Sequence, residues 1–340
     1  MHSGKLKKQA QTRAAEPKVE DKKKKVGQLK SPPPFQLEAS KKKKDEKEMM
    51  PTPAKKAIQA KSANGKEPKP LKDNRKDVEY GPEREGEIAS KGAGDKDAIA
   101  ANDVNQGALG DCWLLASLMT LANSNPQAIR DAITGPLSDG SYNVRLFKKK
   151  GWGRKASFEA ETINVTSSFV TWKAGGYEAY AQGGDTDKAG NEELWVKLIE
   201  KAYAKWKGSF AKIDGGWEEK ALESLTGKNY ESTSFGGGFF GIGKLSDADL
   251  QKQMQDGLGA GDAMTASTKS DSAINKADKD EGGFAKQNDI VGRHAYAVLS
   301  ANAKGVRLRN PWGGASANPE PFLTWKQFRK YYRDITTTSK

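Results

Sequence analysis

The chain has 340 residues but only one cysteine, Cys112, and only two histidines. A single thiol excludes any disulfide within the chain and any zinc site built from several cysteines. Whatever chemistry Cys112 has, it therefore carries out as a lone thiol. Of the histidines, His2 lies in a lysine-rich first segment. This leaves His294 as the one imidazole available to the rest of the chain.

Long apolar runs are also missing from the sequence. No stretch approaches the roughly 20 apolar residues that cross a bilayer. The lysine-rich start is not followed by the apolar region of a secretory signal. We therefore expect no membrane span and a cytoplasmic location.

Aromatic residues are almost absent from the first segment, where Phe35 is the only one before Tyr80. Residues 1–80 hold 23 Lys and Arg against 11 Asp and Glu, so they carry nearly all of the chain's net charge of +13. So little apolar surface cannot offset the entropy lost on ordering. We predict a disordered, lysine-rich arm or pro-segment over 1–80. It is either simply solvated or contacts an anionic partner through unspecific charge, and we expect no DNA-specific binding.

The remaining residues, 81–340, are nearly neutral and change in pattern along the chain. After a glycine-rich entry loop at 81–104, apolar spacing predicts helices and then strands. The helices cover residues 111–122, 191–207, 216–226 and 246–255, and the strands cover residues 263–267, 294–301 and 305–309. This order indicates an α+β protein, with a helical lobe over about 81–210 and a β-rich lobe over about 211–340.

Single residues sharpen two of these helices. Ser246 is predicted to cap the start of the helix at 246–255, and Gly257 to stop it. In the helix at 191–207, an apolar stripe lies opposite a polar face. That polar face consists of Lys197, Glu200, Lys201 and Lys205.

Cys112 lies in the first turn of the apolar helix, directly after a loop that contains Gly107 and Gly110. A free cysteine in such a helix is most often a small buried hydrophobe. The position also favours reactivity, because the amino terminus of a helix stabilises a thiolate relative to a thiol. Position alone does not decide between the two.

His294 opens one apolar strand, and Asn310 ends the next. If these strands form a hairpin, the two residues lie near each other at its open end. The amide oxygen of Asn310 could then accept the second imidazole N–H and fix the ring, as the orienting member of a nucleophile–base set. A structural histidine and a plain Asn-Pro turn are the alternatives.

Segments that resemble the active-site motifs of the calpain family of cysteine proteases occur in the family's order. The cysteine motif is at 106–116, Gln-Gly-Ala-Leu-Gly-Asp-Cys-Trp-Leu-Leu-Ala. The histidine motif is at 292–296, Gly-Arg-His-Ala-Tyr, and the asparagine motif at 307–313, Arg-Leu-Arg-Asn-Pro-Trp-Gly. Residues 198–205 are also similar to the calpain core. The likeness covers about residues 100–335, and it identifies 81–340 as a calpain-like catalytic domain.

The resemblance implies a papain-like fold with two lobes and a cysteine-type endopeptidase acting through an acyl-enzyme on protein or peptide substrates. Cys112 would be the nucleophile, paired as a thiolate with the imidazolium of His294, and Asn310 would orient that ring. Gln106 would complete the oxyanion hole, and Trp312 would shield the contact between Asn310 and His294. A loop hydrogen bond for Gln106 and a core position for Trp312 are the alternatives.

The resemblance also implies calcium as an activator, with no cofactor required for the chemistry. Asp103 stands where the family has a calcium ligand, but the acidic partner before the helix at 191–207 is displaced. Its nearby substitutes are Asp185, Asp187, Glu192 and Glu193. After the asparagine motif, residues 314–321 hold only Glu320, too few oxygens for a second hard-cation site.

Two other functions stay open from the sequence. The chain could be a scaffold that keeps the protease fold and binds an anionic partner, or an enzyme that passes the acyl group to an amine instead of water. The glycine pattern at Gly236, Gly238 and Gly241 lacks the Ser or Thr of a phosphate-binding loop, so we interpret it as a flexible loop.

Overall fold

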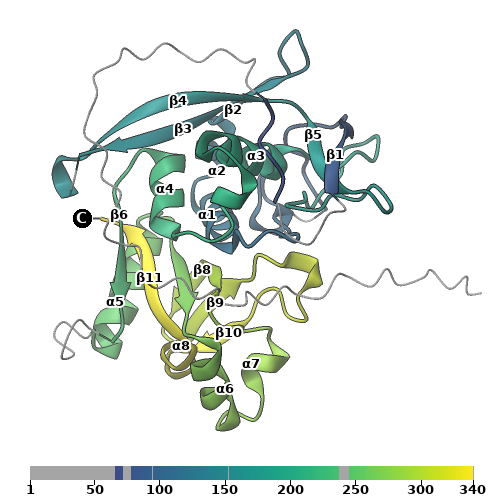
Figure 1. Ribbon diagram of the computed structural model, residues 1–340. Helices are drawn as coiled ribbons and strands as arrows, with labels where there is room; N and C mark the ends of the chain where they lie inside the picture. Colours follow the sequence, from purple (N-terminus) through teal and green to yellow (C-terminus); the bar gives the residue numbers. More distant parts are fainter. Residues whose placement is uncertain (1–65, 72–77, 94, 152, 237–244, 340) are drawn as a thin grey trace, which may run out of the picture. The chain divides into compact units, whose positions relative to one another are not determined.

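Helices and strands follow one another from the first described residue to the last in the computed structural model (Figure 1). It describes residues 66–71, 78–93, 95–151, 153–236 and 245–339, all within one structural unit. The arm predicted over 1–80 lies outside the described residues as far as residue 65, and so does most of the glycine loop, 237–244.

The first half contains the predicted apolar helix, α1 (Cys112–Ser124), which is buried from Trp113 to Ala122. It is followed by α2 (Pro126–Arg130), α3 (Trp195–Lys207) and α4 (Glu218–Thr226). The start of α3 lies later than the predicted residue 191. Asn191 is held in a preceding turn, where its backbone N–H donates to Asp187 Oδ1 at 2.9 Å.

Strands are also present in this half, which the sequence pattern did not predict. β3 (Tyr142–Lys150) and β4 (Ser157–Val165) form a long antiparallel ribbon, extended by β2 (Ile133–Thr134). Figure 1 shows this ribbon beside α3 and α4, which pack against it. β1 (Val78–Glu83) pairs with β5 (Ser168–Trp172), so the predicted entry loop begins only after β1.

The end of the predicted arm belongs to the folded unit. Glu67 Oε1 lies 2.9 Å from Lys201 Nζ, and the side chain of Lys201 is only 1% exposed. The backbone N–H of Leu71 donates to the hydroxyl of Tyr180 at 2.9 Å. The prediction of disorder over 1–80 is therefore wrong for residues 66–71 and 78–80, which cover the polar face of α3.

The polar face of α3 is largely buried. Lys197, Glu200 and Lys201 lie on the predicted polar face opposite the apolar stripe, yet their exposed fractions are only 2%, 3% and 1%. The amphipathic pattern locates the apolar stripe correctly, but segments distant in sequence cover the other side.

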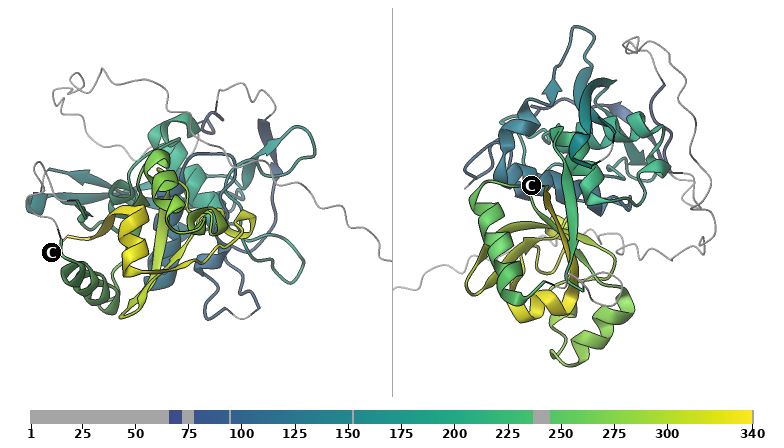
Figure 2. Two further views of the ribbon diagram at one scale, coloured as in Figure 1. Left: turned by 90° about the horizontal axis from the view of Figure 1, so that it is seen from below. Right: turned by 90° about the vertical axis from the view of Figure 1, so that its left-hand side faces the viewer.

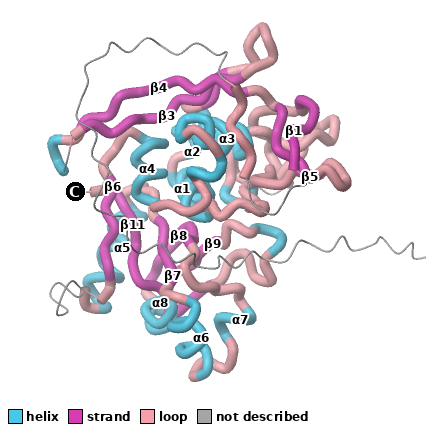
Figure 3. Tube along the Cα trace, viewed as in Figure 1, coloured by secondary structure: helices cyan, strands magenta, loops and turns pink. Residues whose placement is uncertain are grey.

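The second half forms an antiparallel sheet of six strands within the described residues, in the order β10-β9-β8-β7-β11-β6. The strands are β6 (Tyr230–Ser234), β7 (Thr265–Thr268), β8 (Ala295–Asn302), β9 (Gly305–Arg309), β10 (Phe322–Thr324) and β11 (Tyr332–Thr338). β8 and β9 form the predicted hairpin, closed where Asn302 pairs with Gly305. The α+β class is thus confirmed, as the colours of Figure 3 make visible.

Helices α5 (Asp247–Gly259), α6 (Asp271–Lys279), α7 (Phe284–Gln287) and α8 (Trp325–Tyr331) accompany this sheet (Figure 2). The Ser246 cap of α5 is confirmed, because its hydroxyl accepts the N–H of Asp249 at 3.0 Å. The predicted stop at Gly257 is wrong. Gly257 stays helical and lies against Met264, where a Cβ atom would approach the Met264 side chain to 3.2 Å.

Two hydrophobic cores divide the chain, and β8 contributes to both. Its Ala295 and Ala297 belong to the first core, with α1, α3 and α4, whereas Tyr296 and Val298 belong to the second. This follows from the alternation of side chains along a strand. The cores separate between Tyr230 and Phe235, and the lobe boundary near 210 stays a prediction. No described helix is long and apolar enough to cross a membrane.

Candidate active site

Cys112 is the first residue of α1, and its side chain is partly buried against β8. The backbone N–H of Ala295, the first residue of β8, donates to its sulfur. The methyl groups of Ala295 and Ala297 form the β8 face in this core, so α1 approaches the strand closely. The amino terminus of α1 and the start of β8 therefore meet, and the thiol of Cys112 lies next to Ala295, the residue after His294.

His294 and Asn310 meet at the open end of the β8–β9 hairpin. The His294 Nε2 atom lies 2.9 Å from Asn310 Oδ1, and Asn310 is completely buried. An amide oxygen can only accept, so we assign the proton to Nε2, which leaves the Nδ1 lone pair of the neutral ring free. Asn310 is fixed in turn, since its Oδ1 accepts the N–H of Trp312 at 3.1 Å and its Nδ2 donates to the carbonyl of Asp289 at 3.3 Å.

The backbone at His294 is held in an unusual conformation. Arg293, just before it, has a φ of 55°, a left-handed value that side chains other than glycine rarely adopt. The N–H of His294 donates to Thr268 Oγ1 at 2.9 Å, and that hydroxyl donates to the carbonyl of Val291 at 2.7 Å. The neighbouring strand β7 thus fixes the backbone position from which the imidazole of His294 extends.

Two aromatic rings enclose the imidazole, which is 7% exposed. The Trp312 ring centroid lies 5.0 Å from that of His294, and the Tyr296 ring meets it edge-on at 4.9 Å. Trp312 therefore lies directly beside the contact between His294 and Asn310.

Burial controls the protonation of both central groups. It raises the pKa of the Cys112 thiol to about 12, and the nearby carboxyl of Glu218 acts in the same direction. It lowers the pKa of His294 to about 4, against the opposing hydrogen bond to Asn310. Burial thus works against the charged form of each group, because a charge loses hydration when it is buried.

Gln106 lies in the loop that precedes α1. Its side-chain Nε2 donates to the carbonyl of Leu109 at 2.7 Å, and its backbone N–H donates to the carbonyl of Pro311 at 2.8 Å. The loop hydrogen bond foreseen as an alternative is therefore present. One amide hydrogen remains on Nε2, and the second contact ties this loop to the turn after Asn310.

Carboxylates gather around Asp103. Ligand atoms of Asp95, Asp103 and Asp185 lie within 4.8 Å of one another. Asp103 Oδ2 accepts from the N–H of Ala100 at 2.7 Å and from Trp195 Nε1 at 3.2 Å, whereas Oδ1 is buried without a hydrogen-bond partner among the described residues. Burial and the charge of Asp185 help to raise the pKa of Asp103 to about 7. This unpartnered oxygen and the all-carboxylate donor set fit a hard cation such as calcium.

The acidic residues that the sequence offers as calcium ligands lie in different surroundings. Asp185 joins Asp103, while Glu192 pairs with Lys197 at 2.8 Å and Asp187 accepts backbone N–H groups of its own turn. Glu193 accepts the N–H groups of Ser90, Gly184 and Asp185. Asp95 was missed, because no spacing rule connects it to Asp103 across the loop. Glu320 pairs with Arg309 at 2.6 Å.

A model of the calpain family of cysteine proteases matches residues 53–333. The chain belongs to the calpain family. It therefore has the papain-like core of these proteases. The matched region reaches further toward the amino terminus than the likeness over 100–335 inferred from the motifs.

Individual calpains are similar over most of this chain but are much longer. Calpain clp-4 of Caenorhabditis elegans is 29% identical over 220 residues, 62% of this chain and 27% of the relative. The calpain-type cysteine protease DEK1 of Zea mays is 30% identical over 227 residues, which are 63% of this chain and 9% of the relative. The human calpain-1 catalytic subunit is 28% identical over 249 residues, which are 70% of this chain and 31% of the relative. This chain thus spans at most about a third of these calpains.

Proposed function

We propose that the chain is a cysteine-type endopeptidase with Cys112 as nucleophile, His294 as base and Asn310 as orienting residue. The observation that carries the proposal is the 2.9 Å contact of His294 Nε2 with Asn310 Oδ1, which leaves Nδ1 as the basic atom. The sulfur of Cys112 accepts from the neighbouring Ala295 N–H. Family membership supports the same roles for these residues.

The proton of Cys112 passes to His294 Nδ1, and the resulting thiolate attacks the carbonyl carbon of a peptide bond. The C–N bond then breaks, and Nδ1 returns the proton to the leaving amine. Water attacks the resulting thioester, releasing the acid and restoring the thiol of Cys112.

The oxyanion of the tetrahedral intermediate requires donors at the start of α1. The backbone N–H of Cys112 lies in the first turn, where helix amides have no internal partner. The second hydrogen on Gln106 Nε2 is the other proposed donor. Loss of one such donor lowers the rate by roughly 100-fold or more.

Calcium is proposed as an activator held by Asp95, Asp103 and Asp185. Bound calcium would compensate their negative charges and join the segments that carry them. The chain's own contribution is the buried Asp103 Oδ1, which has no hydrogen-bond donor in the described part of the chain and lies three residues before Gln106. A cytoplasmic location and an anionic partner for the arm also remain proposals.

The test uses the full chain with casein as substrate, in calcium and in chelator. Wild type is expected to cleave casein, and Cys112→Ala to fall by on the order of 10³-fold or more. Cys112 is also expected to be the residue labelled by a thiol-directed epoxide. Mass spectrometry distinguishes hydrolysis from transfer to an added amine. Equal, negligible cleavage by both proteins under every condition would remove the protease proposal and leave the scaffold.

A further inference from the structure

Asp111, immediately before the nucleophile, does not behave as an ordinary helix cap. It is the N-cap residue of α1 and is completely buried, yet its side chain accepts no N–H from the first turn. Aspartate at this position normally does so. Neither of its carboxyl oxygens accepts a hydrogen bond from an N–H group of another described residue.

The group that Asp111 meets is another acid. Its carboxyl lies within hydrogen-bonding reach of the carboxyl of Glu200 on α3, which is 3% exposed. Glu200 Oε1 accepts the N–H of Ala181 at 3.1 Å. Asp214, in the loop before α4, also lies near Asp111. Its Oδ1 accepts the N–H of Gly110 at 2.8 Å.

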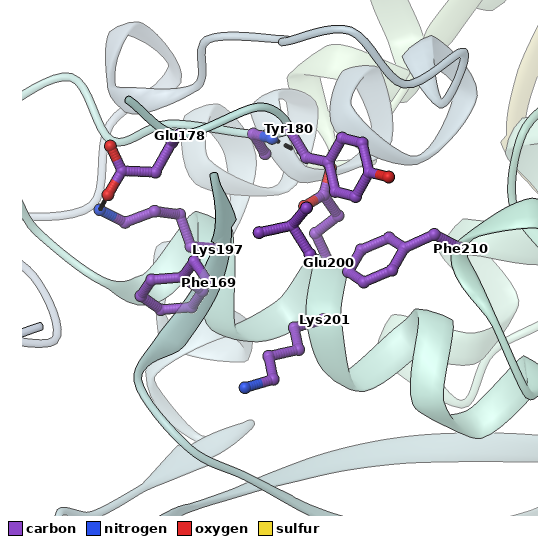
Figure 4. A pocket seen from close by; sticks show the side chains of 9 residues that line it. Phe169, Glu178, Tyr180, Lys197, Glu200, Lys201 and Phe210 are labelled. Atoms are coloured by element: carbon purple, nitrogen blue, oxygen red, sulfur yellow. Dashed lines mark hydrogen bonds and ion pairs between the residues drawn. The ribbon is translucent and has the colours of Figure 1, made fainter. Parts of the chain in front are cut away.

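The lysines near Glu200 are committed elsewhere. A cavity of about 10 Å³, room for roughly one water, borders Glu200, Lys197 and Lys201 (Figure 4). Lys201 Nζ bonds the carbonyls of Thr166 and Ser168 and pairs with Glu67. Lys197 Nζ pairs with Glu192 at 2.8 Å. Figure 4 shows their ammonium groups directed away from the Glu200 carboxyl.

Two ionised carboxylates in contact, buried and without a cation, repel each other strongly. We propose that Asp111 and Glu200 hold one proton between them and act together as positioning residues for the nucleophile. Asp111 donates and Glu200 accepts. The inference rests on the proposed function in taking Cys112 as the nucleophile. Burial and the neighbouring carboxylate raise the pKa of Asp111 well above its usual value, in agreement with this assignment.

The shared proton would connect two parts of the active site. Asp111 precedes Cys112, while Glu200 holds the backbone at Ala181. The segment around Ala181 also holds the Gln106 loop, because the N–H of Ala108 donates to the carbonyl of Ala179 at 2.8 Å. The pair thus fixes the nucleophile and the oxyanion loop relative to each other. A neutral Asp111 also removes one negative charge that would oppose thiolate formation next door.

Asp111→Asn tests the shared proton, because an amide donates to Glu200 without needing to be protonated. Because the pKa of Asp111 is raised in the folded protein, the stability that its carboxyl contributes is complete below the usual carboxyl pKa. This contribution falls as pH rises toward the pKa in the folded protein. In chelator, the melting temperature of Asp111→Asn should therefore gain about 2–4 °C on wild type between pH 5 and pH 9. Glu200→Gln should show the same trend. A difference that is constant with pH, or an Asp111→Asn protein that does not fold, overturns the proposal.

The positioning role is tested on the thiol itself. The rate of Cys112 alkylation by iodoacetamide should fall about tenfold in Asp111→Ala and recover in Asp111→Asn. Asp214→Asn is the matched control, since it changes a neighbouring carboxyl that already has an N–H donor, and it should not reproduce the pH trend. Equal alkylation of the Ala and Asn variants contradicts a positioning role. Neither readout needs proteolysis, so an absence of casein cleavage would reject the protease proposal separately.

Discussion

The first half of the chain contains two groups of carboxyls that face the same electrostatic problem in different surroundings. Asp95, Asp103 and Asp185 converge where two of the three side chains remain partly exposed. Asp111 and Glu200 meet where both are buried. We propose an ion for the first group and a proton for the second. The two proposals differ with solvent access, because both groups consist of the same kind of side chain.

The largest effect expected from this comparison is on calcium binding. Calcium at 100 times its dissociation constant should stabilise wild type by about 2.7 kcal/mol, and Asp103→Asn should lose nearly all of this gain. Thermal unfolding with calcium and with chelator measures the difference. Asp187→Asn, a change at a half-buried residue outside the cluster, is the control. Full stabilisation of Asp103→Asn by calcium would show that the ion binds elsewhere.

The same substitution should have the opposite sign without calcium. The pKa of Asp103 is raised from 3.8 to about 7, so its contribution to stability is complete below pH 3.8 and is lost as pH rises to about 7. In chelator at pH 7, Asp103→Asn should be more stable than wild type by on the order of 2 kcal/mol. Denaturant titrations from pH 4 to pH 8 measure this gain. A variant that is less stable at every pH would mean that Asp103 is already compensated inside the protein.

The smallest effect concerns the connection from the cluster of Asp95, Asp103 and Asp185 to Asn310. The Arg309 guanidinium donates to the carbonyl of Ala101 at 2.9 Å and to that of Asn102 at 3.4 Å. Arg309→Lys keeps a charge for Glu320 but cannot hold both carbonyls. Calcium affinity should stay within about twofold, while casein cleavage falls roughly threefold to tenfold. Titration calorimetry and cleavage assays separate the two quantities. Equal losses of both would assign Arg309 to the calcium loop alone.

Local patterns predicted the parts of the molecule that depend on neighbours in sequence. The apolar helix at 111–122 and the hairpin from His294 to Asn310 are present because each is specified by its own spacing and turn. The motifs likewise placed Cys112 beside that hairpin. These elements need little information from distant segments.

Tertiary contacts produced what the sequence pattern missed. The burial of Glu200 could not be predicted from the sequence, because nothing in α3 reveals that its carboxyl accepts the N–H of Ala181. Asp95 joins Asp103 only through loop folding. The pKa values of Cys112 and His294 also depend on burial, and burial outweighs the helix-terminus effect that the sequence suggested.

The contact between Glu67 and Lys201 has a practical consequence for any shortened version of this protein. A version that starts at residue 81, the boundary predicted from composition, would delete the carboxylate 2.9 Å from the Lys201 ammonium, which is almost completely enclosed. The side chain of Glu67 is itself 29% exposed, so its removal should destabilise by less than the roughly 3–5 kcal/mol of a fully buried pair. A version that starts at Lys66 keeps the partner and removes most of the lysine-rich stretch. The place to cut is therefore set by a side chain on α3 and not by where the charge pattern changes.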